Sequence, residues 1–318
     1  MIFHSTLKNQ VTRCIICESN HFSIISDKVR GGINQNVVIC HKCGFVFLHP
    51  LELSNNEYAK HYEESYYKKK EFDLTPNEKR KSLQKKRGRF IVSFVKGHFI
   101  LDQNTRILEV GCGSGGIINE FSKYGCYLTG IEPSPLWNSH LNSLGCIKVV
   151  NVTLEDYLSP KKFNLIILSH VFEHFINLDM VCRKLKSLLN VHGLIYIEVP
   201  DIHNIKLSRK LHNSFFRLEH ISYFSLNSLK SLLIKYNFNI LRTELSENVI
   251  KILVNLSPQS NDSYVLKKDV FQTISKIYYY RFLRFPIHKF FYLMKKLIID
   301  SKAYNKFRGF LWSFKEII

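Results

Sequence analysis

Four cysteines in the first fifty residues have the spacing of a metal site. Cys14 and Cys17 form one Cys-x-x-Cys pair, and Cys40 and Cys43 form a second pair after 22 intervening residues. Two such pairs can supply four thiolates to one tetrahedral Zn²⁺, which leaves no coordination position for a catalytic water. The pairs therefore predict a structural zinc site, with disulfides or separate thiols as the alternatives.

Short apolar runs on both sides of the second cysteine pair must position it. Residues 36–39 and 45–48 are typical of strands, and Gly44 between them is suited to the left-handed backbone that often follows a metal-binding turn. These runs predict a hairpin that resembles a zinc ribbon. The N-terminal residues lack the pattern of a secretion signal, so we expect a reducing compartment, which disfavours disulfides.

A glycine-rich turn is the second feature that could do chemistry. Gly111, Gly113 and Gly115 permit a sharp bend and let a ligand approach the backbone closely at the start of a helix. With Gly116 the turn also satisfies a dinucleotide-binding fingerprint. Glu132, 21 residues after Gly111, could bind ribose hydroxyls in a nicotinamide enzyme or in an S-adenosylmethionine (SAM) enzyme.

Alternating strand and helix patterns must position this turn. The expected strands are residues 105–110, 126–131, 163–168 and 193–199, and the expected helices between them are residues 117–124 and 180–190. Such alternation predicts an α/β fold in which helices cover both faces of a parallel sheet. In sheets of this kind the turn after the first strand is the place to expect a ligand.

Residues 101–256 resemble the class I SAM-dependent methyltransferases. The motifs that match are Glu109 before the glycine turn, residues 130–134, residues 163–174 and residues 193–200, although Asn164 replaces the usual aspartate. The resemblance implies a Rossmann-like fold with a mostly parallel seven-stranded sheet, and SAM as cofactor. It further implies that the cofactor is bound by Glu109, Gly111, Gly113, Gly115, Glu132, Glu155 (or its neighbour Asp156) and Ser169.

A proton acceptor is expected near the methyl acceptor, because a sulfonium methyl is already activated and the protein must mainly align the acceptor and remove a proton. The segment 219–225 resembles the Glu-His-x-x-Tyr-Phe-Ser block of zinc-containing deoxysugar C-methyltransferases. This resemblance implies that His220 is the general base and that Glu219 assists it or binds a substrate hydroxyl. It also implies an acceptor-site aromatic residue, for which Tyr67 or Tyr66 is the candidate. The alternative for His220 is packing, or capping of the helix that should open near Ser225.

Glu173 and His174 form a rival pair on the loop after the expected strand 163–168. A Val-x-Glu-His sequence is common at this place among methyltransferases with different substrates, which favours a structural or cofactor-adjacent role. In coenzyme Q O-methyltransferases a similar loop is linked to a divalent cation. His170 stands where their first acidic residue would be, so a second metal is not expected.

The C-terminal segment has an unusual composition. Residues 264–318 contain twelve basic and three acidic residues among many aromatic ones, which suits a membrane interface or an anionic polymer. Helices packed on the core or on a second subunit, with the lysines in solvent, are the slightly favoured alternative. The similar sugar methyltransferases continue with a third domain instead. We expect four units: a zinc-ribbon module (1–50), a helical connector (51–100), a methyltransferase domain (101–256) and a basic aromatic tail (257–318).

The bulk composition limits the classes of function. With 318 residues, 45% of them hydrophobic, and no long apolar run, the chain is typical of a soluble globular protein, and we expect a cytoplasmic enzyme with peripheral contact at the inner membrane face as an option. The formal net charge of +19 favours anionic partners, although compositional drift explains it equally well.

The motifs together predict a SAM-dependent methyltransferase that acts on a small molecule. We expect a sugar acceptor, linked to a nucleotide or a lipid, in polysaccharide or secondary-metabolite synthesis. The alternatives are an RNA methyltransferase with a zinc ribbon, for which the signature of many amine-methylating enzymes is missing, and a non-catalytic scaffold with a SAM fold. Whether carbon, oxygen or nitrogen is methylated stays open at this point.

Overall fold

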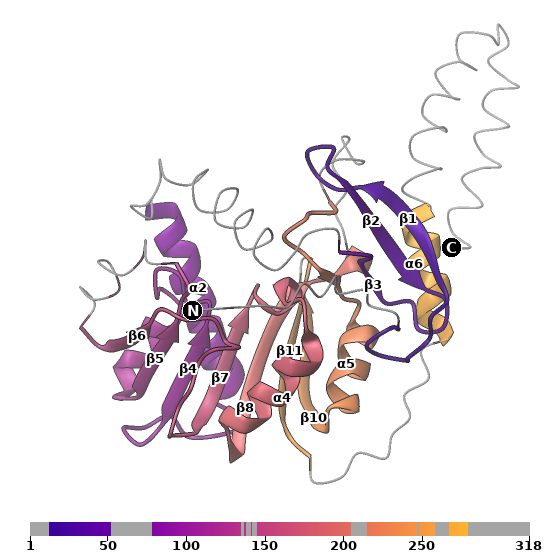
Figure 1. Ribbon diagram of the computed structural model, residues 1–318. Helices are drawn as coiled ribbons and strands as arrows, with labels where there is room; N and C mark the ends of the chain where they lie inside the picture. The colour runs from indigo at the N-terminus through magenta and orange to yellow at the C-terminus, as the bar shows by residue number, and fades with distance from the viewer. Residues whose placement is uncertain are drawn as a thin grey trace, which may run out of the picture.

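The chain forms two β-sheets with helices packed against the larger one (Figure 1). The computed structural model describes residues 13–51, 78–134, 137, 141, 145–204, 215–246, 248–257 and 267–278. Among the helices of this part, none combines the length and the apolar character that crossing a bilayer requires.

The larger sheet has seven strands in the order β10-β11-β8-β7-β4-β5-β6. Strands β4 to β8 run parallel to one another, whereas β11 pairs antiparallel with both β8 and β10. The strands are β4 (Arg106–Val110), β5 (Tyr127–Ile131), β6 (Ile147–Val150), β7 (Phe163–Ser169), β8 (Leu189–Pro200), β10 (Phe238–Ser246) and β11 (Val249–Leu256). The predicted Rossmann-like fold with a mostly parallel seven-stranded sheet is thereby confirmed.

Apolar side chains on both faces of the central strands explain why these segments form the middle of the sheet. On one face, α2 (Glu78–Val95) and the 3-10 helix η3 (Ile118–Tyr124) pack on the sheet; on the other face, α4 (Leu178–Leu188) and α5 (Leu226–Lys235) do so. Parallel strands that are covered on both faces are mostly apolar for this reason. The central strands β4 and β7 are parallel neighbours, so their carboxyl ends lie at the same edge of the sheet.

Both expected helices differ from the sequence-based expectation. The helix expected at 180–190 begins at Leu178 and ends at Leu188, because Leu189 already pairs with Phe163 at the start of β8. The helix expected at 117–124 is a 3-10 helix that ends at Gly125, whose φ is +71°. Ser225 caps α5 as expected: its side chain accepts a hydrogen bond from the Ser228 amide at 3.0 Å.

The smaller sheet joins the cysteine-rich segment to a distant part of the chain. Its order is β1-β2-β3-β9, and all pairs are antiparallel. The strands are β1 (Phe22–Lys28), β2 (Asn34–Cys40), β3 (Val46–Leu48) and β9 (Ser222–Tyr223). The expected β2–β3 hairpin is present and Gly44 has a φ of +74°. Strand β9, which follows His220 directly, was not expected there.

The two sheets also share a hydrophobic core. Phe224, which follows β9, has its ring centroid 5.5 Å from that of Phe45 and 5.7 Å from that of Phe172. The same buried cluster contains Cys14 and Cys43 together with side chains of α4 and α5. The cysteine-rich segment and the larger sheet therefore pack as neighbours rather than as separate bodies.

Helix α6 (Lys267–Tyr278) is the described part of the predicted basic tail. Its Asp269 is fully buried and accepts hydrogen bonds from the Ser225 hydroxyl and, at 3.1 Å, from the Asn227 amide group. Thr273 bonds His203 at 2.7 Å. This helix packs on the core through polar contacts, whereas residues 279–318 of the predicted tail lie outside the described residues.

Candidate functional site

The glycine turn after β4 has a backbone that side chains other than glycine rarely adopt. The φ angles are +66° at Gly111, +51° at Gly113 and +72° at Gly115. A Cβ added to Gly113 would meet nothing within 4 Å, so the turn leaves open space beside its backbone. A Cβ added to Gly111 would lie 2.7 Å from the side chain of Val171. The turn therefore offers backbone groups to a ligand and contacts the loop after β7.

Glu132 lies at the end of β5 and bonds to this turn. Its Oε2 accepts a hydrogen bond from the Gly113 amide at 2.9 Å, and its Oε1 accepts one from the Ser134 amide at 3.1 Å. The residue is buried. Because a carboxylate oxygen can accept more than one hydrogen bond, this arrangement allows Glu132 to bind ribose hydroxyls as predicted.

Glu109 takes a position beneath the turn rather than on its open side. Its Oε2 accepts a hydrogen bond from the Ile118 amide at 3.0 Å, which braces the start of η3. Burial raises the pKa of this carboxyl group to about 8, and the nearby charge of Glu132 adds to the effect. The hydrogen bond between Glu109 and the Ile118 amide is structural. A direct contact between Glu109 and the cofactor stays a prediction.

The other residues predicted to bind the cofactor are Ser169 and Glu155, or its neighbour Asp156. Ser169 ends β7, and its buried hydroxyl makes no hydrogen bond to the described residues, so it can bind a ligand. Glu155 follows β6 and accepts a hydrogen bond from Lys184 Nζ at 3.3 Å through its main-chain oxygen. Asp156 bonds Thr153 at 2.9 Å. The predicted acceptor residue Tyr67 lies outside the described residues.

Helix α2 covers the glycine turn, which the sequence did not indicate. Gln84 accepts a hydrogen bond from the Ser114 hydroxyl at 2.5 Å. A Cβ added to Gly116 would lie 2.6 Å from Gln84, and one added to Gly88 would lie 2.7 Å from the Ile117 oxygen. This close approach of α2 to the turn is not predicted by any motif in the sequence of the helix.

The two rival candidates for the acceptor site form one cluster. Glu173 and His174 lie on the 3-10 helix η5 (Phe172–His174) after β7, and His220 lies just before β9. One side-chain nitrogen or oxygen from each of these three residues lies within 4.8 Å of the other two. The imidazole rings of His174 and His220 meet edge to face with centroids 4.9 Å apart. We call these three residues the acceptor cluster.

The tautomer of His174 follows from its backbone partner. Its Nδ1 donates a hydrogen bond to the Glu219 carbonyl oxygen at 2.5 Å, which leaves Nε2 unprotonated in the neutral ring. Nε2 lies 3.9 Å from Oε1 of Glu173. Glu219 was predicted to assist His220 through its side chain. The carboxylate in the acceptor cluster is that of Glu173. Glu219 contributes a main-chain oxygen, and the assistance of its side chain to His220 stays a prediction.

Glu173 is the most buried charged group at this site. It is 1% exposed, and neither of its carboxylate oxygens accepts a hydrogen bond within the described structure. The nearest donor is His170 Nδ1, which lies 3.6 Å from Oε1 and beyond hydrogen-bond length. Such a buried acceptor is costly unless a ligand or a nearby charge compensates it.

A chain of alternating charges compensates Glu173. His170 Nε2 lies 3.1 Å from Oε1 of Glu198, and that oxygen lies 3.1 Å from Nε of Arg87 on α2. Although burial opposes it, the carboxylates of Glu173 and Glu198 raise the pKa of His170 to about 9. Burial also opposes ionisation of Glu173, but His170 and His174 lower its pKa to about 2. His170 is therefore an imidazolium between two carboxylates.

His220 has the opposite electrostatic character. Burial lowers the pKa of its imidazole to about 4, so the ring is unprotonated at neutral pH. An unprotonated imidazole beside an ionised carboxylate can accept a proton. The cluster also has the ligand types of a divalent cation site, but the imidazolium of His170 beside Glu173 already balances its charge.

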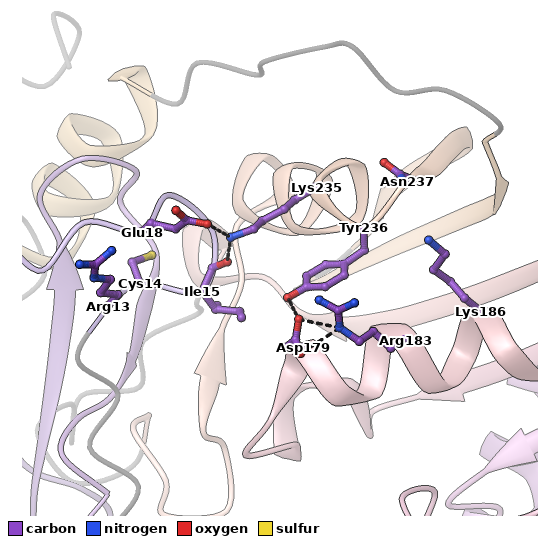
Figure 2. A pocket seen from close by; sticks show the side chains of 10 residues that line it. All are labelled: Arg13, Cys14, Ile15, Glu18, Asp179, Arg183, Lys186, Lys235, Tyr236 and Asn237. Atoms are coloured by element: carbon purple, nitrogen blue, oxygen red, sulfur yellow. Dashed lines mark hydrogen bonds and ion pairs between the residues drawn. The ribbon is translucent and has the colours of Figure 1, made fainter.

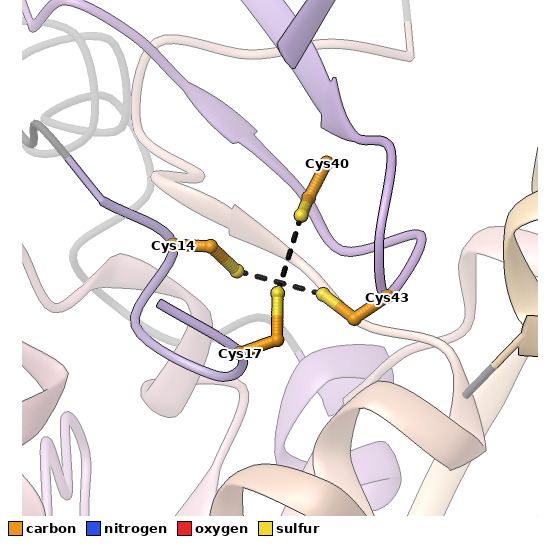
Figure 3. Close-up of side chains that lie close together, drawn as sticks. All are labelled: Cys14, Cys17, Cys40 and Cys43. Atoms are coloured by element: carbon orange, nitrogen blue, oxygen red, sulfur yellow. Dashed lines mark hydrogen bonds between the residues drawn. The ribbon is translucent and has the colours of Figure 1, made fainter. Parts of the chain in front are cut away.

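The four cysteines of the N-terminal pairs converge as predicted from their spacing (Figure 3). The Sγ atoms of Cys14 and Cys43 lie 3.5 Å apart, those of Cys17 and Cys40 lie 3.4 Å apart, and all four lie within 4.8 Å of one another. A tetrahedral Zn²⁺ with bonds of about 2.3 Å needs sulfur separations of roughly 3.8 Å. All four are free thiols, and the donor set fits zinc.

The close approach of the four thiols shifts their pKa values. Hydrogen bonding with Cys40 raises the pKa of Cys14 to about 12, and burial adds to the effect. The neighbouring thiols of Cys14 and Cys43 lower the pKa of Cys40. A bound cation would replace these shared protons, because zinc coordinates thiolates.

Comparison with known proteins shows the family to which this chain is similar. A family model described as a methyltransferase domain matches residues 76–243. The ubiquinone biosynthesis O-methyltransferase of Glaesserella parasuis is 28% identical over 107 residues, which cover 29% of this chain and 44% of that protein. The protein of the same name from Bradyrhizobium diazoefficiens is 24% identical over 101 residues, 29% of this chain and 38% of that protein. This chain thus spans less than half of the length of these curated relatives.

Among solved structures, the chain is similar to the 1,6-didemethyltoxoflavin-N1-methyltransferase of Burkholderia thailandensis, which was crystallised with its substrate and S-adenosylhomocysteine. The TM-score is 0.50 at 12% identity, and the match covers 70% of this chain and 96% of that one. At this identity the likeness concerns the fold alone.

Proposed function

The chain belongs to the methyltransferase-domain family, and on this premise we propose that it transfers a methyl group from SAM to a small-molecule acceptor. One observation supports this most directly. The glycine turn contacts the loop after β7 at Val171, two residues before Glu173, whose buried oxygens accept no hydrogen bond within the described structure. A cofactor on the turn and an acceptor at the cluster would thus be neighbours.

The proposed SAM site uses groups from three strand ends. The positive φ angles of Gly111 and Gly113 let the methionine part approach the backbone, and Glu132 accepts hydrogen bonds from the ribose. The buried hydroxyl of Ser169 is a further polar contact. Glu109 and Glu155 remain proposed contacts of the same cofactor. When bound, SAM supplies a methyl group that its sulfonium has activated.

In the proposed reaction His220 removes the acceptor proton. Its imidazole is unprotonated, and the ionised Glu173 stabilises the imidazolium that forms. His174 is held by the Glu219 carbonyl and packs edge to face on the His220 ring, which fixes the orientation of the base. The proposed roles of the Glu219 carboxylate, as a binder of substrate hydroxyls, and of Tyr67 have only the sequence block as support.

The identity of the acceptor is the finer part of the proposal. A sugar, linked to a nucleotide or a lipid, is suggested by the similarity of residues 219–225 to the sugar C-methyltransferase block. The names of the curated relatives instead suggest O-methylation of an intermediate of ubiquinone biosynthesis. An unprotonated base beside the acceptor suits both, because each reaction removes a proton from the atom that is methylated.

We also propose that Cys14, Cys17, Cys40 and Cys43 bind a structural zinc ion. Cytoplasmic location and membrane contact through residues 264–318 also stay predictions, because most of that segment lies outside the described residues.

Transfer of radioactive methyl from SAM to a panel of sugar nucleotides and of ubiquinone precursors tests the proposed function. The parent protein should label at least one acceptor. His220→Asn should keep the SAM affinity and lose roughly 10²- to 10⁴-fold in rate, the range for loss of a positioned base. Near-parental turnover of His220→Asn, together with an inactive His174→Asn, would refute the role of His220.

A further inference from the structure

A cavity of about 510 Å³ lies between the cysteine-rich segment and helices α4 and α5 (Figure 2). It belongs to the face of the sheet opposite to α2 and the glycine turn. Its walls come from segments more than 150 residues apart in sequence. The residues that line it are Arg13, Cys14, Ile15, Glu18, Asp179, Arg183, Lys186, Lys235, Tyr236 and Asn237.

The two carboxylates of this cavity are already neutralised. Glu18 lies 2.9 Å from Lys235 Nζ. Asp179 lies 3.1 Å from Nε of Arg183 and accepts a hydrogen bond from the Tyr236 hydroxyl at 2.7 Å. These two partners lower the pKa of Asp179. Each of the two carboxylates thus forms an ion pair with one basic side chain, Lys235 or Arg183, and offsets its charge.

Two cations remain without an acidic partner. No carboxylate lies within 4.0 Å of the charged groups of Arg13 or Lys186 in the part of the chain that the structure describes. The cavity thus carries a net charge of +2 from four basic and two acidic side chains. Ile15 and the Tyr236 ring add apolar surface. A concave surface with an excess of positive charge attracts anions, and apolar surface favours an organic one.

From this charge balance we propose that the cavity binds the phosphate or diphosphate group of a small organic molecule. The two guanidinium groups can bond phosphate oxygens in pairs, and the lysines add positive charge. An anion held there would contact the cysteine-rich segment, α4 and α5 at once. The site is separate from the proposed methyl-transfer site and does not depend on the proposed reaction.

Calorimetry with inorganic pyrophosphate at low ionic strength tests the site in the full chain. One equivalent should bind, and Arg13→Ala and Lys186→Ala should each weaken binding on the order of 10-fold, as expected for loss of a charged hydrogen-bond donor. Arg30→Ala and Lys162→Ala are matched controls, because they remove the same charge from exposed residues that do not line the cavity. These two variants should bind like the parent.

Equal weakening in all four variants would overturn the proposal, since it would show binding to the overall charge only. Absence of pyrophosphate binding would overturn it as well. His220→Asn should bind pyrophosphate like the parent, so failure of the proposed reaction would not affect this result. If the phosphate belongs to the methyl acceptor, pyrophosphate should raise the KM for that acceptor; if it belongs to a separate ligand, this KM should not change.

Discussion

At the residue scale, Glu132 connects the cofactor turn to the end of the neighbouring strand. Its carboxylate holds the Gly113 amide and the Ser134 amide in their positions. Glu132→Ala should weaken SAM binding about 10- to 100-fold, because it removes a charged acceptor of ribose hydroxyls and loosens the turn. Titration calorimetry measures this effect. Glu155→Ala should weaken binding less, and parental affinity in Glu132→Ala would disprove the ribose assignment.

His170 makes the stability of the protein dependent on pH. Its pKa of about 9 in the folded protein lies above the ordinary value of 6.5, because Glu173 and Glu198 hold its proton. This stabilisation is fully present below pH 6.5. It is lost as the pH rises from about 6.5 to about 9, because only the folded state then keeps the proton. The free energy of unfolding should therefore fall across this window.

Thermal unfolding of the parent and of His170→Gln between pH 6 and 9.5 tests this linkage. The difference of about 2.5 pKa units, from 6.5 to about 9, corresponds to about 3 kcal/mol at most. The advantage of the parent over His170→Gln should shrink as the pH rises. Parallel melting curves at all pH values would show that His170 is not held as an imidazolium.

At the scale of elements, local patterns predict the strands and not the contacts between distant segments. The β2–β3 hairpin, β4 and β7 were predicted, because apolar runs of strand length carry the necessary signal. Strand β9 has two residues and exists only because β3 pairs with it. The place of Glu173 beside His220 likewise depends on packing between η5 and the segment before β9, which no short motif encodes.

Helix α6 and the cysteine-rich segment meet at Gly44. A Cβ at this position would lie 2.8 Å from the Val270 backbone nitrogen, and the φ of +74° is unfavourable for any other residue. Gly44→Ala should therefore lower the free energy of unfolding by about 1–2 kcal/mol for the backbone and by about 1–3 kcal/mol more for the overlap.

Gly32→Ala is the matched control, because its φ of +78° carries the same backbone penalty while a Cβ there meets nothing within 4 Å. Chemical denaturation of both variants separates the two contributions. Equal losses of stability in the two variants would mean that a side chain at position 44 does not overlap with α6.

At the scale of the whole molecule, the cysteine-rich segment supports the catalytic segment. Strand β3 pairs with β9 at Val46 and Phe47, and the Leu48 amide donates a hydrogen bond to the Ile221 oxygen at 3.0 Å. His220 is the residue just before Ile221. The position of the proposed base therefore depends on a hairpin whose end carries Cys40 and Cys43.

Removal of the proposed zinc should consequently impair catalysis more than cofactor binding. The glycine turn and Glu132 follow strands β4 and β5 of the larger sheet, so SAM affinity should change little after chelation or in Cys43→Ser. The hairpin would loosen, and a shift of His220 by about 1 Å can cost on the order of 10²-fold in rate. Turnover and SAM calorimetry on the same sample distinguish this effect from global unfolding, which would abolish both. Unchanged turnover in a sample shown to contain no zinc would mean that the larger sheet alone positions His220.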